Sequence, residues 1–421
     1  MEEVENIRKV EIVISDLHLG PGWSKIPSGN LEAFHDDEKF RHFIECLIER
    51  YKGMEMELVV DGDAFDTLAV LYHGKSIAIP YERVDLYKIR EIIIGHPYVF
   101  DALKEFVGKN FKLTFIIGNH DLCLNWPSVQ EEIIKRLGEK NSSRILFKDK
   151  LQENGIYIAH GNSEHHNKTP ENPIVSQTVL NVWRRGGWKK FFKDDIFSTE
   201  KVLNMPMGHY LITALENPLK KHNLLIGHMR RHGFIWLDAI VGFGRKTSYR
   251  RHRFFAVIAM LTCFWVMLKF WWEMRDRHIL KKIVQVLWWT ITGALDGQRP
   301  EDEAKRLLEN DDINVVIFGH EHVPRYEIIR VGAKNKLYVN CGTWQLIYEV
   351  KVEPIEIKWR RFRSFERLCK KIRRFFKKMF WPEVEEITEF TMVEITEKDD
   401  GAPSVQLLRF NDEKRELENL V

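Results

Sequence analysis

Short apolar runs alternate with helix-like segments along the first 160 residues, and no other feature constrains the fold of this chain as strongly. Apolar runs of this length, separated by helices, are typical of buried strands in α/β proteins. The sequence therefore predicts an α/β fold. The predicted strands are 11–15, 57–60, 113–117, 156–159, 313–318 and 336–340, and the predicted helices include 40–51 and 99–107.

A long segment of different composition separates the two parts of the predicted core. Residues 166–311 are rich in Trp, Phe, Arg and Lys and contain longer helical patterns. We interpret this segment as a helical, Trp-rich insertion into a core formed by 1–165 and 312–421. Near the C-terminus, 386–395 and 404–410 alternate apolar and polar residues around a turn-like Asp-Asp-Gly sequence, which predicts a hairpin.

Composition excludes several classes of protein. With 421 residues, 44% of them hydrophobic and 30% charged, the chain can bury a full core and lacks a disordered composition. A mean hydropathy of −0.32 argues against many membrane spans. The five cysteines are scattered without a CxxC pair, which favours neither a zinc ribbon nor a disulfide scaffold. We expect no signal peptide and a reducing, cytoplasmic location.

Metal-ligand side chains cluster directly after the predicted strands, where open α/β sheets place their sites. Carboxylates, imidazoles and one amide suit hard to borderline divalent ions rather than a thiolate zinc site. Seven such ligands exceed the needs of one tetrahedral ion and fit two ions that share a bridging carboxylate. Each block alone also fits ordinary polar turn residues, and only the five together favour a metal site. The blocks are Ser15-Asp16-Leu17-His18, Gly62-Asp63-Ala64-Phe65-Asp66, Gly118-Asn119-His120-Asp121, Ala159-His160-Gly161 and Gly319-His320-Glu321-His322.

The order DxH, GDxxD, GNHD, a lone His and GHxH resembles the motif series of the calcineurin-like metallophosphoesterases. The resemblance covers about residues 10–165 and 312–412. Within that superfamily, SDLHLG and GDAFD are most similar to the bacterial UDP-2,3-diacylglucosamine diphosphatase branch, and NCGTW at 340–344 resembles the NxGxW segment of related enzymes. The resemblance implies a four-layer α/β/β/α sandwich, with two sheets back to back and helices outside.

The resemblance also implies a role for each motif residue. His120 would contact the substrate phosphate and assist the leaving group, and Asp121 would orient the His120 ring. Asp66 would lie behind the ligands. Glu321 in GHxH and Asn162 after His160 depart from many relatives, which concerns substrate contacts more than metal binding. The implied ligands are Asp16, His18 and His322 for one divalent ion, Asn119, His160 and His320 for the other, and Asp63 as the bridge.

A basic amphipathic segment, 358–381, predicts contact with a membrane. Between 358 and 378 it carries eleven Lys and Arg residues against one acidic residue, Glu366, and its apolar residues recur at helical spacing. Basic amphipathic helices of this kind lie in the headgroup region of a bilayer. The alternatives are a helix that packs on the core with a solvated basic face, and a nucleic-acid-binding patch.

Two apolar runs in the insertion also suggest a membrane. Residues 254–268 carry no charge, and 283–295 contain Trp288 and Trp289. A spanning helix needs about 20 residues. A single crossing would leave the core strands on opposite sides of the bilayer. We therefore favour helices that dip into one leaflet, with a buried helical hairpin packed on the core as the alternative.

Together these features predict a metal-dependent phosphoric ester hydrolase. We expect a dinuclear phosphoesterase or diphosphatase, peripheral to the inner face of a membrane, that acts on a phosphorylated, amphiphilic, lipid-linked substrate rather than on nucleic acid. We expect two divalent ions, manganese first, with iron, zinc or magnesium as alternatives. The competing functions are a soluble nucleotide or nucleic-acid phosphodiesterase and a membrane-binding scaffold with a silent site. No feature indicates an oligomeric state.

Overall fold

The computed structural model describes most of the predicted core and a few residues of the predicted insertion. The predicted helix at 358–381 and the apolar runs 254–268 and 283–295 lie outside the described residues. The described residues are 7–22, 32–74, 81–162, 174–176, 201–203, 205, 300–345, 347–350, 384–387, 390–398 and 403–421.

The chain divides into two compact units, and all five motif blocks belong to the first. The first unit comprises Met1–Leu224, Met274–Gln345 and Glu389–Val421. The second comprises Leu225–Glu273 and Leu346–Thr388. Within the second unit the structure describes two strands that pair antiparallel, β12 (Ile347–Val350) and β13 (Val384–Ile387).

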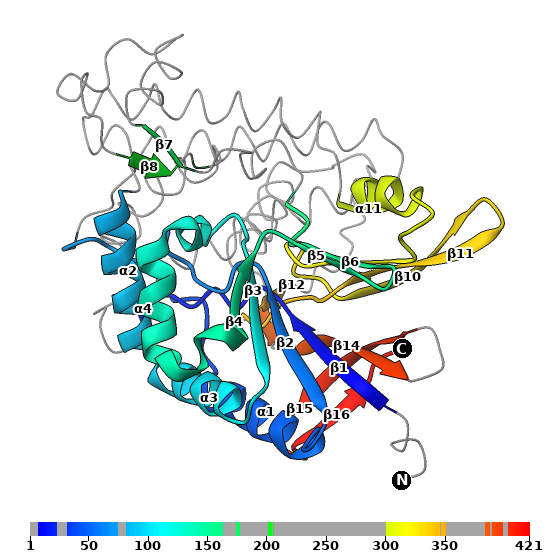
Figure 1. The fold of residues 1–421 in the computed structure, drawn as a ribbon, viewed down its shortest axis with the longest axis horizontal. Coiled ribbons are helices and arrows are strands. Elements are labelled where there is room, and N and C mark those ends of the chain that lie inside the picture. The colour runs from blue at the N-terminus through cyan, green and yellow to red at the C-terminus, as the bar shows by residue number, and fades with distance from the viewer. Residues whose placement is uncertain are drawn as a thin grey trace, which may run out of the picture. The chain divides into compact units, whose positions relative to one another are not determined.

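Two mixed sheets form the first unit (Figure 1). The seven-stranded sheet runs in the order β16 (Glu416–Asn419), β15 (Ser404–Asn411), β14 (Thr391–Lys398), β1 (Ile7–Ile14), β2 (Glu55–Asp61), β3 (Lys112–Ile116) and β4 (Ile145–Lys148). The five-stranded sheet runs in the order β10 (Arg325–Val331), β11 (Lys334–Asn340), β9 (Val315–Phe318), β6 (Ile156–Ile158) and β5 (Leu151–Glu153). A separate pair comprises β7 (Ile174–Ser176) and β8 (Lys201–Leu203).

In the seven-stranded sheet the parallel strands occupy one half, out to the edge strand β4, and the antiparallel strands occupy the other half. In the five-stranded sheet the parallel strands lie at the centre and the antiparallel strands at both edges. β1, β2, β3 and β4 pair parallel, and β14 joins β1 antiparallel. In the second sheet β9 lies parallel to both β6 and β11, while β5 and β10 are the antiparallel edges. The central strands of both sheets therefore end at one edge of each sheet, and the motif blocks follow those ends.

Helices cover one face of the seven-stranded sheet (Figure 1). On α1, Phe40, Phe43 and Leu47 follow the i, i+3, i+7 spacing of an apolar stripe and are fully buried. They share one hydrophobic cluster with Ile12 and Ile14 of β1. The helices are α1 (Asp37–Arg50), α2 (Glu82–Gly95), α3 (Pro97–Gly108), α4 (Pro127–Leu137) and α11 (Pro300–Leu308), with short 3₁₀ helices at Leu122–Asn125 and Glu139–Arg144.

The two sheets share a second hydrophobic cluster. Because side chains alternate along a strand, Val13 of β1 points to the opposite face of the sheet from Ile12 and Ile14. Val59 of β2 points to the same face as Val13. Both valines lie in one cluster with Ile317 of β9 and other residues of the five-stranded sheet. A third cluster joins α11 to β9 and β11. α11 lies within the segment 166–311 that the sequence marks as the insertion.

The structure confirms the predicted α/β fold and its strands, with ends that differ by a few residues. β14 and β15 form the predicted hairpin. The prediction of one strand over 386–395 is wrong, because this stretch contributes to two strands with different partners. Val384–Ile387 pairs with β12, whereas Thr391–Lys398 pairs with β1 and β15. Among the described residues, no helix is both long and apolar enough to cross a membrane.

Candidate metal centre

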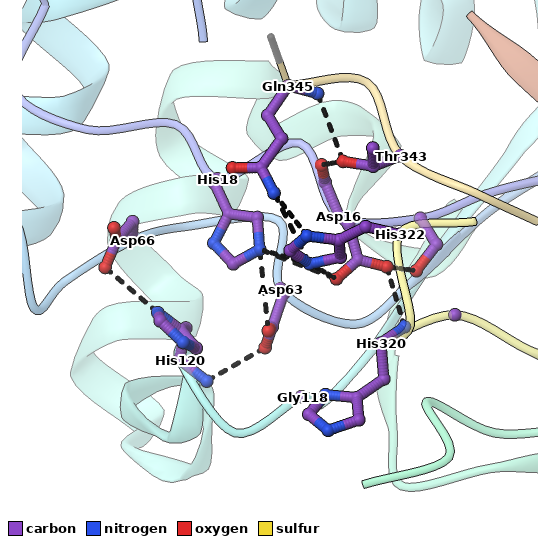
Figure 2. A network of polar contacts seen from close by, with 12 residues as sticks. Asp16, His18, Asp63, Asp66, Gly118, His120, His320, His322, Thr343 and Gln345 are labelled. Atoms are coloured by element: carbon purple, nitrogen blue, oxygen red, sulfur yellow. Dashed lines mark hydrogen bonds and ion pairs between the residues drawn. The ribbon is translucent and has the colours of Figure 1, made fainter. Parts of the chain in front are cut away.

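The carboxyl ends of five strands bring the predicted ligands together. Asp16, Asp63 and Asn119 follow β1, β2 and β3 in the seven-stranded sheet. His160 and His320 follow β6 and β9 in the five-stranded sheet. Figure 2 shows side chains from both sheets facing one another. The His320 backbone N–H also donates a hydrogen bond of 2.8 Å to Asp16 Oδ2, which ties the two sheet edges directly.

Asp16, His18 and His322 form the first group of ligands. His322 Nε2 lies 3.0 Å from Asp16 Oδ1 and 3.3 Å from His18 Nε2. His18 Nε2 lies 3.5 Å from the same Asp16 oxygen. The three ligand atoms all lie within 4.8 Å of one another, so together they can hold one metal ion. This is the set predicted for one ion.

Asp63, His160 and His320 form a second group within the same 4.8 Å limit. His160 Nε2 lies 3.2 Å from Asp63 Oδ2. The other ring nitrogen, Nδ1, lies 2.9 Å from the main-chain oxygen of Asp61. Because a carbonyl oxygen only accepts, the neutral ring carries its proton on Nδ1 and presents the Nε2 lone pair to the group.

Asp63 connects the two groups. Its Oδ2 lies 3.2 Å from His160 Nε2 and 3.7 Å from His18 Nε2. Its other oxygen, Oδ1, accepts a hydrogen bond of 2.8 Å from the His120 backbone N–H. One oxygen is therefore held by the backbone while the other lies between the two groups. A carboxylate in this position can bridge two ions.

Asn119 Oδ1 is buried without a hydrogen-bond partner among the described residues. His160 Nε2 is also buried, and its contact with Asp63 Oδ2 at 3.2 Å is an ion-pair contact that lacks hydrogen-bond geometry. A buried polar atom that lacks a partner costs about 1–3 kcal/mol, and native proteins leave few such atoms. Both atoms are of the types that bind divalent ions. The buried His and Asp clusters can therefore hold a metal ion, and the donor set fits one.

The two carboxylates stay ionised despite their burial. Asp16 Oδ2 accepts hydrogen bonds from Ser15 Oγ at 2.5 Å and from the His320 N–H, which leaves Oδ1 facing the imidazoles. Burial opposes ionisation, but the His322 and His160 rings outweigh it and hold the pKa of Asp16 well below its ordinary value. The pKa of Asp63 is lowered in the same way, with burial opposed by His160 and His120. Two buried, ionised carboxylates in one cluster favour the binding of cations.

Asp66, and not Asp121, is the carboxylate beside the His120 ring. His120 Nδ1 donates to Asp66 Oδ1 at 3.1 Å (Figure 2). The Asp121 oxygens accept instead from the backbone N–H groups of Gly118 at 2.7 Å and Ala64 at 2.8 Å. The prediction that Asp121 orients His120 is therefore wrong. Asp121 fixes the loops after β2 and β3, and its burial together with the charge of Asp63 raises its pKa to about 7.

His120 itself lies at the metal-ligand cluster. One ring nitrogen falls within 4.8 Å of ligand atoms of His18 and Asp63. The His18 and His120 rings meet edge to face, with centroids 4.7 Å apart. The ring is therefore within reach of a substrate that binds between the ligands.

The backbone of the site is strained. Five of the seven predicted ligands adopt positive φ angles of 50° to 64°, a region that non-glycine residues seldom occupy. Such strain clusters at functional sites, because it persists only where the surrounding structure imposes it. The five residues are Asp16, His18, Asp63, His320 and His322.

Two glycines allow the ligand loops to approach each other closely. A Cβ atom at Gly118 would collide with Asp63 Oδ1, and one at Gly319 would collide with Ser15 Oγ. Neither glycine has a positive φ. Glycine is therefore required at both positions because a Cβ atom would not fit, and not because of the backbone conformation. Gly62, in contrast, has φ +76° and supplies a sharp turn in the backbone.

Sequence reasoning missed two residues of the site. Gln345 contacts the His322 ring, and its only sequence signal is its position directly after the NCGTW segment. Asp61 is fully buried, and neither of its carboxylate oxygens has a hydrogen-bond partner among the described residues. Burial raises the pKa of Asp61 well above its ordinary value. The period-two pattern of β2 signals this burial, because Asp61 lies on the same strand face as Val59.

Comparisons with known proteins add no relative. No protein-family model matches the chain, and no curated protein matches its sequence.

Proposed function

We propose that this chain is a dinuclear metal-dependent phosphoesterase of the calcineurin-like type, built on a four-layer α/β/β/α sandwich. The observation that carries the proposal is the position of Asp63 Oδ2 between His18 Nε2 at 3.7 Å and His160 Nε2 at 3.2 Å. A carboxylate oxygen shared by two groups of ligands is what a pair of ions needs. The order of the five sequence motifs supports the same reading.

Each ion has its own ligands in this proposal. Asp16, His18 and His322 hold one ion, and Asn119, His160 and His320 hold the other, with Asp63 shared. The mixture of carboxylate, imidazole and amide favours manganese, with iron, zinc or magnesium as alternatives. When bound, divalent ions would lower the pKa of a coordinated water, from 15.7 to about 7 in the strongest zinc cases, and would neutralise charge on a phosphoryl group.

His120 acts on the leaving group. As an imidazolium it donates a hydrogen bond from Nδ1–H to Asp66 Oδ1, 3.1 Å away, and its Nε2 proton is available to a substrate oxygen. The Asp66 carboxylate holds the ring in place and stabilises its positive charge. In this proposal Asp66, in the loop after β2, orients the ring, and His120, in the loop after β3, is the proton donor.

The substrate in this proposal is an amphiphile with a phosphate or diphosphate. The predicted insertion leaves the core just after His160 and returns just before His320, so both ends of the insertion lie beside the ligands in the sequence. Burying acyl chains contributes about 0.8 kcal/mol per CH₂. A long-chain substrate is therefore expected to show a higher kcat/KM than a short-chain version of the same head group. Equal values would favour a water-soluble substrate.

Replacement of Asp63 tests the dinuclear proposal. Asp63→Ala removes the shared ligand, so we expect a lower metal content and loss of hydrolysis. The metal content is measured by elemental analysis, and hydrolysis on a panel of phosphomonoester, phosphodiester and diphosphate substrates. The control is Asp149→Asn, at an exposed aspartate outside the site. Wild-type turnover in Asp63→Ala would overturn the proposal.

The basic segment at 358–381 gives the proposed membrane contact its own test. Each basic residue near an anionic surface contributes about 1 kcal/mol, and salt weakens the effect. Changing Arg360, Arg361, Lys370 and Lys371 to Glu is expected to release the protein from anionic vesicles in a flotation assay. Wild-type binding that ignores both salt and lipid charge would contradict the membrane proposal and leave the phosphoesterase proposal intact.

A further inference from the structure

His120 is held by its backbone as well as by its ring. Its N–H donates a hydrogen bond of 2.8 Å to Asp63 Oδ1, and its ring Nδ1 lies 3.1 Å from Asp66 Oδ1 (Figure 2). Its main-chain oxygen accepts a hydrogen bond of 2.9 Å from the Thr67 hydroxyl. All three partners belong to the loop after β2. The proposed function gives roles to Asp63 and Asp66 and leaves Thr67 without one.

The Thr67 hydroxyl is a fixed donor. A carbonyl oxygen only accepts, so the proton of this hydrogen bond comes from Thr67. The side chain is branched at Cβ, which restricts its χ1 rotation, and the residue is 2% exposed. The hydroxyl therefore points at the His120 carbonyl with little competition from water.

Thr67 and Asp66 are neighbours in one turn, which is tied to a ligand loop. The Ala69 N–H donates to the Asp66 main-chain oxygen at 3.0 Å and to Asp66 Oδ1 at 3.2 Å, which closes the turn. The Asp66 N–H donates to the main-chain oxygen of Leu19 at 2.9 Å, one residue after the predicted ligand His18. The turn therefore has a fixed place beside the metal centre.

We propose that Thr67 is a positioning residue for His120. The inference rests on the proposed function, in which His120 gives a proton to the leaving group. With the N–H and the C=O of His120 both held, the direction of its Cα–Cβ bond is set, and Asp66 has only to fix the rotation of the ring. A misplacement of about 1 Å can cost about 10²-fold in rate. Thr67 therefore acts on catalysis through the place of the His120 ring, and not through metal binding.

Thr114 provides a matched comparison. It is also a buried threonine whose hydroxyl donates to an internal acceptor, Glu57 Oε1 at 2.6 Å. This hydrogen bond joins β2 to β3 within the strands, before the loop that carries His120 begins. A valine at either position removes a buried hydroxyl, so both variants should lose stability. Only the variant at Thr67 should affect the chemical step.

Kinetics of the Mn²⁺-loaded full-length protein test the inference, with aryl phosphate esters whose leaving groups differ in pKa. We expect Thr67→Val to lower kcat about 10–100-fold, most for the leaving group of highest pKa, with unchanged KM and metal content. Thr67→Ser should restore most of kcat, and Thr114→Val should match the wild type. In a His120→Asn background, Thr67→Val should cause no further loss, because the group that Thr67 positions is gone.

The order of the His120 ring is a readout that needs no activity, and ¹³C relaxation of the ring measures it. We expect a rigid ring in the wild type, Thr67→Ser and Thr114→Val. We expect a more mobile ring in Thr67→Val and in Thr67→Ala, which lacks the hydroxyl and adds no methyl group. A ring as rigid in Thr67→Val as in the wild type, or an equal loss of kcat from Thr67→Val with and without His120, would overturn the inference. A wild-type protein that binds no metal and hydrolyses no ester would instead overturn the proposed function, and the ring order would still decide the role of Thr67.

Discussion

Two buried polar clusters of the first unit differ in how their polar atoms are satisfied. At the candidate metal centre, Asn119 Oδ1 and His160 Nε2 have no hydrogen-bond partner among the described residues, and five ligands adopt positive φ angles. In the second cluster, which we call the Glu32–His96 network, Glu32 and His96 are equally buried, yet each has polar partners on both sides.

The Glu32–His96 network joins the loop after His18 to α1 and α3. Glu32 Oε1 accepts from the N–H groups of Gly20 at 3.1 Å and Phe34 at 3.0 Å. Its Oε2 accepts from the Gly22 N–H at 2.6 Å and from His96 Nε2 at 3.2 Å. The other nitrogen of His96 lies 2.8 Å from Asp37 Oδ1. Every one of these contacts is intramolecular, so the network needs no ligand.

The contrast distinguishes buried polar groups that stabilise the fold from buried polar groups that are available to bind a ligand. A buried polar atom with a partner contributes to stability, whereas one without a partner lowers it. A native site keeps unpartnered atoms and a strained backbone only where function requires them. Substitutions at the metal centre should therefore reduce turnover with little effect on folding, and substitutions in the Glu32–His96 network should do the reverse.

The largest expected effect is on turnover, at His120. His120→Asn removes the proposed proton donor, so kcat is expected to fall about 10²–10⁴-fold while metal content and the free energy of unfolding stay close to wild type. Steady-state kinetics with leaving groups of different pKa measure the effect, and a leaving group of low pKa should recover part of the loss. An equal loss for every leaving group would assign His120 to phosphate binding instead.

The carboxylate next to His120 sharpens this test. Asp66→Asn is expected to lower kcat about 10–100-fold, because it removes the partner of His120 Nδ1. The pH profile of kcat should shift with it, since the imidazolium loses its neighbouring charge. A normal pH profile in Asp66→Asn would contradict the assignment of Asp66 as the residue that orients His120.

A substitution in the Glu32–His96 network should affect folding first. Glu32→Gln leaves the buried His96 without one of its carboxylates, and breaking a buried pair in this way costs about 3 kcal/mol. Chemical denaturation measures the loss. Glu105→Gln, which removes an exposed i,i+4 pair with Lys109, serves as the control and should change stability by less than about 1 kcal/mol. A stability loss no larger than the control's would break the comparison.

The same network predicts a pH dependence of stability. Burial lowers the pKa of His96, but Asp37 and Glu32 outweigh burial and raise it to about 9. The pKa is higher in the folded state than in the unfolded state, so the stabilisation is complete below about pH 6.5 and is lost as the pH rises through 9. The shift corresponds to about 3 kcal/mol. The difference in unfolding free energy between wild type and His96→Gln should shrink over this range; a constant difference would argue against a charged His96.

The smallest expected effect has the opposite sign. Asp61 is fully buried and neither carboxylate oxygen has a partner among the described residues, so Asp61→Val should stabilise the metal-free protein by about 1 kcal/mol. Valine matches the neighbouring Val59 on the inter-sheet face of β2. Thermal unfolding in the presence of a chelator measures the change. A destabilised Asp61→Val protein would show that Asp61 contributes to the fold and would weaken the contrast between the two clusters.

The sequence predicts which side chains meet at the candidate metal centre, because each motif block follows an apolar run, and strand ends in a parallel sheet meet at one edge. It cannot predict the partner of His120. Asp121 is its neighbour in the chain, but adjacent side chains in a turn point in different directions, and Asp66 arrives from another strand. Likewise, alternation predicts that 386–395 is extended but does not specify its partners, which is why β13 and β14 read as one strand.

The central claim is that Asp63 joins two metal sites, and the most direct measurement is the electron paramagnetic resonance spectrum of the protein titrated with Mn²⁺. A shared carboxylate holds two ions close enough to couple magnetically. We predict that the wild type binds two Mn²⁺ per chain with a spin-coupled spectrum, and that Asp63→Ala loses the coupling. A single ion per chain, or two ions with uncoupled spectra in the wild type, would contradict the claim.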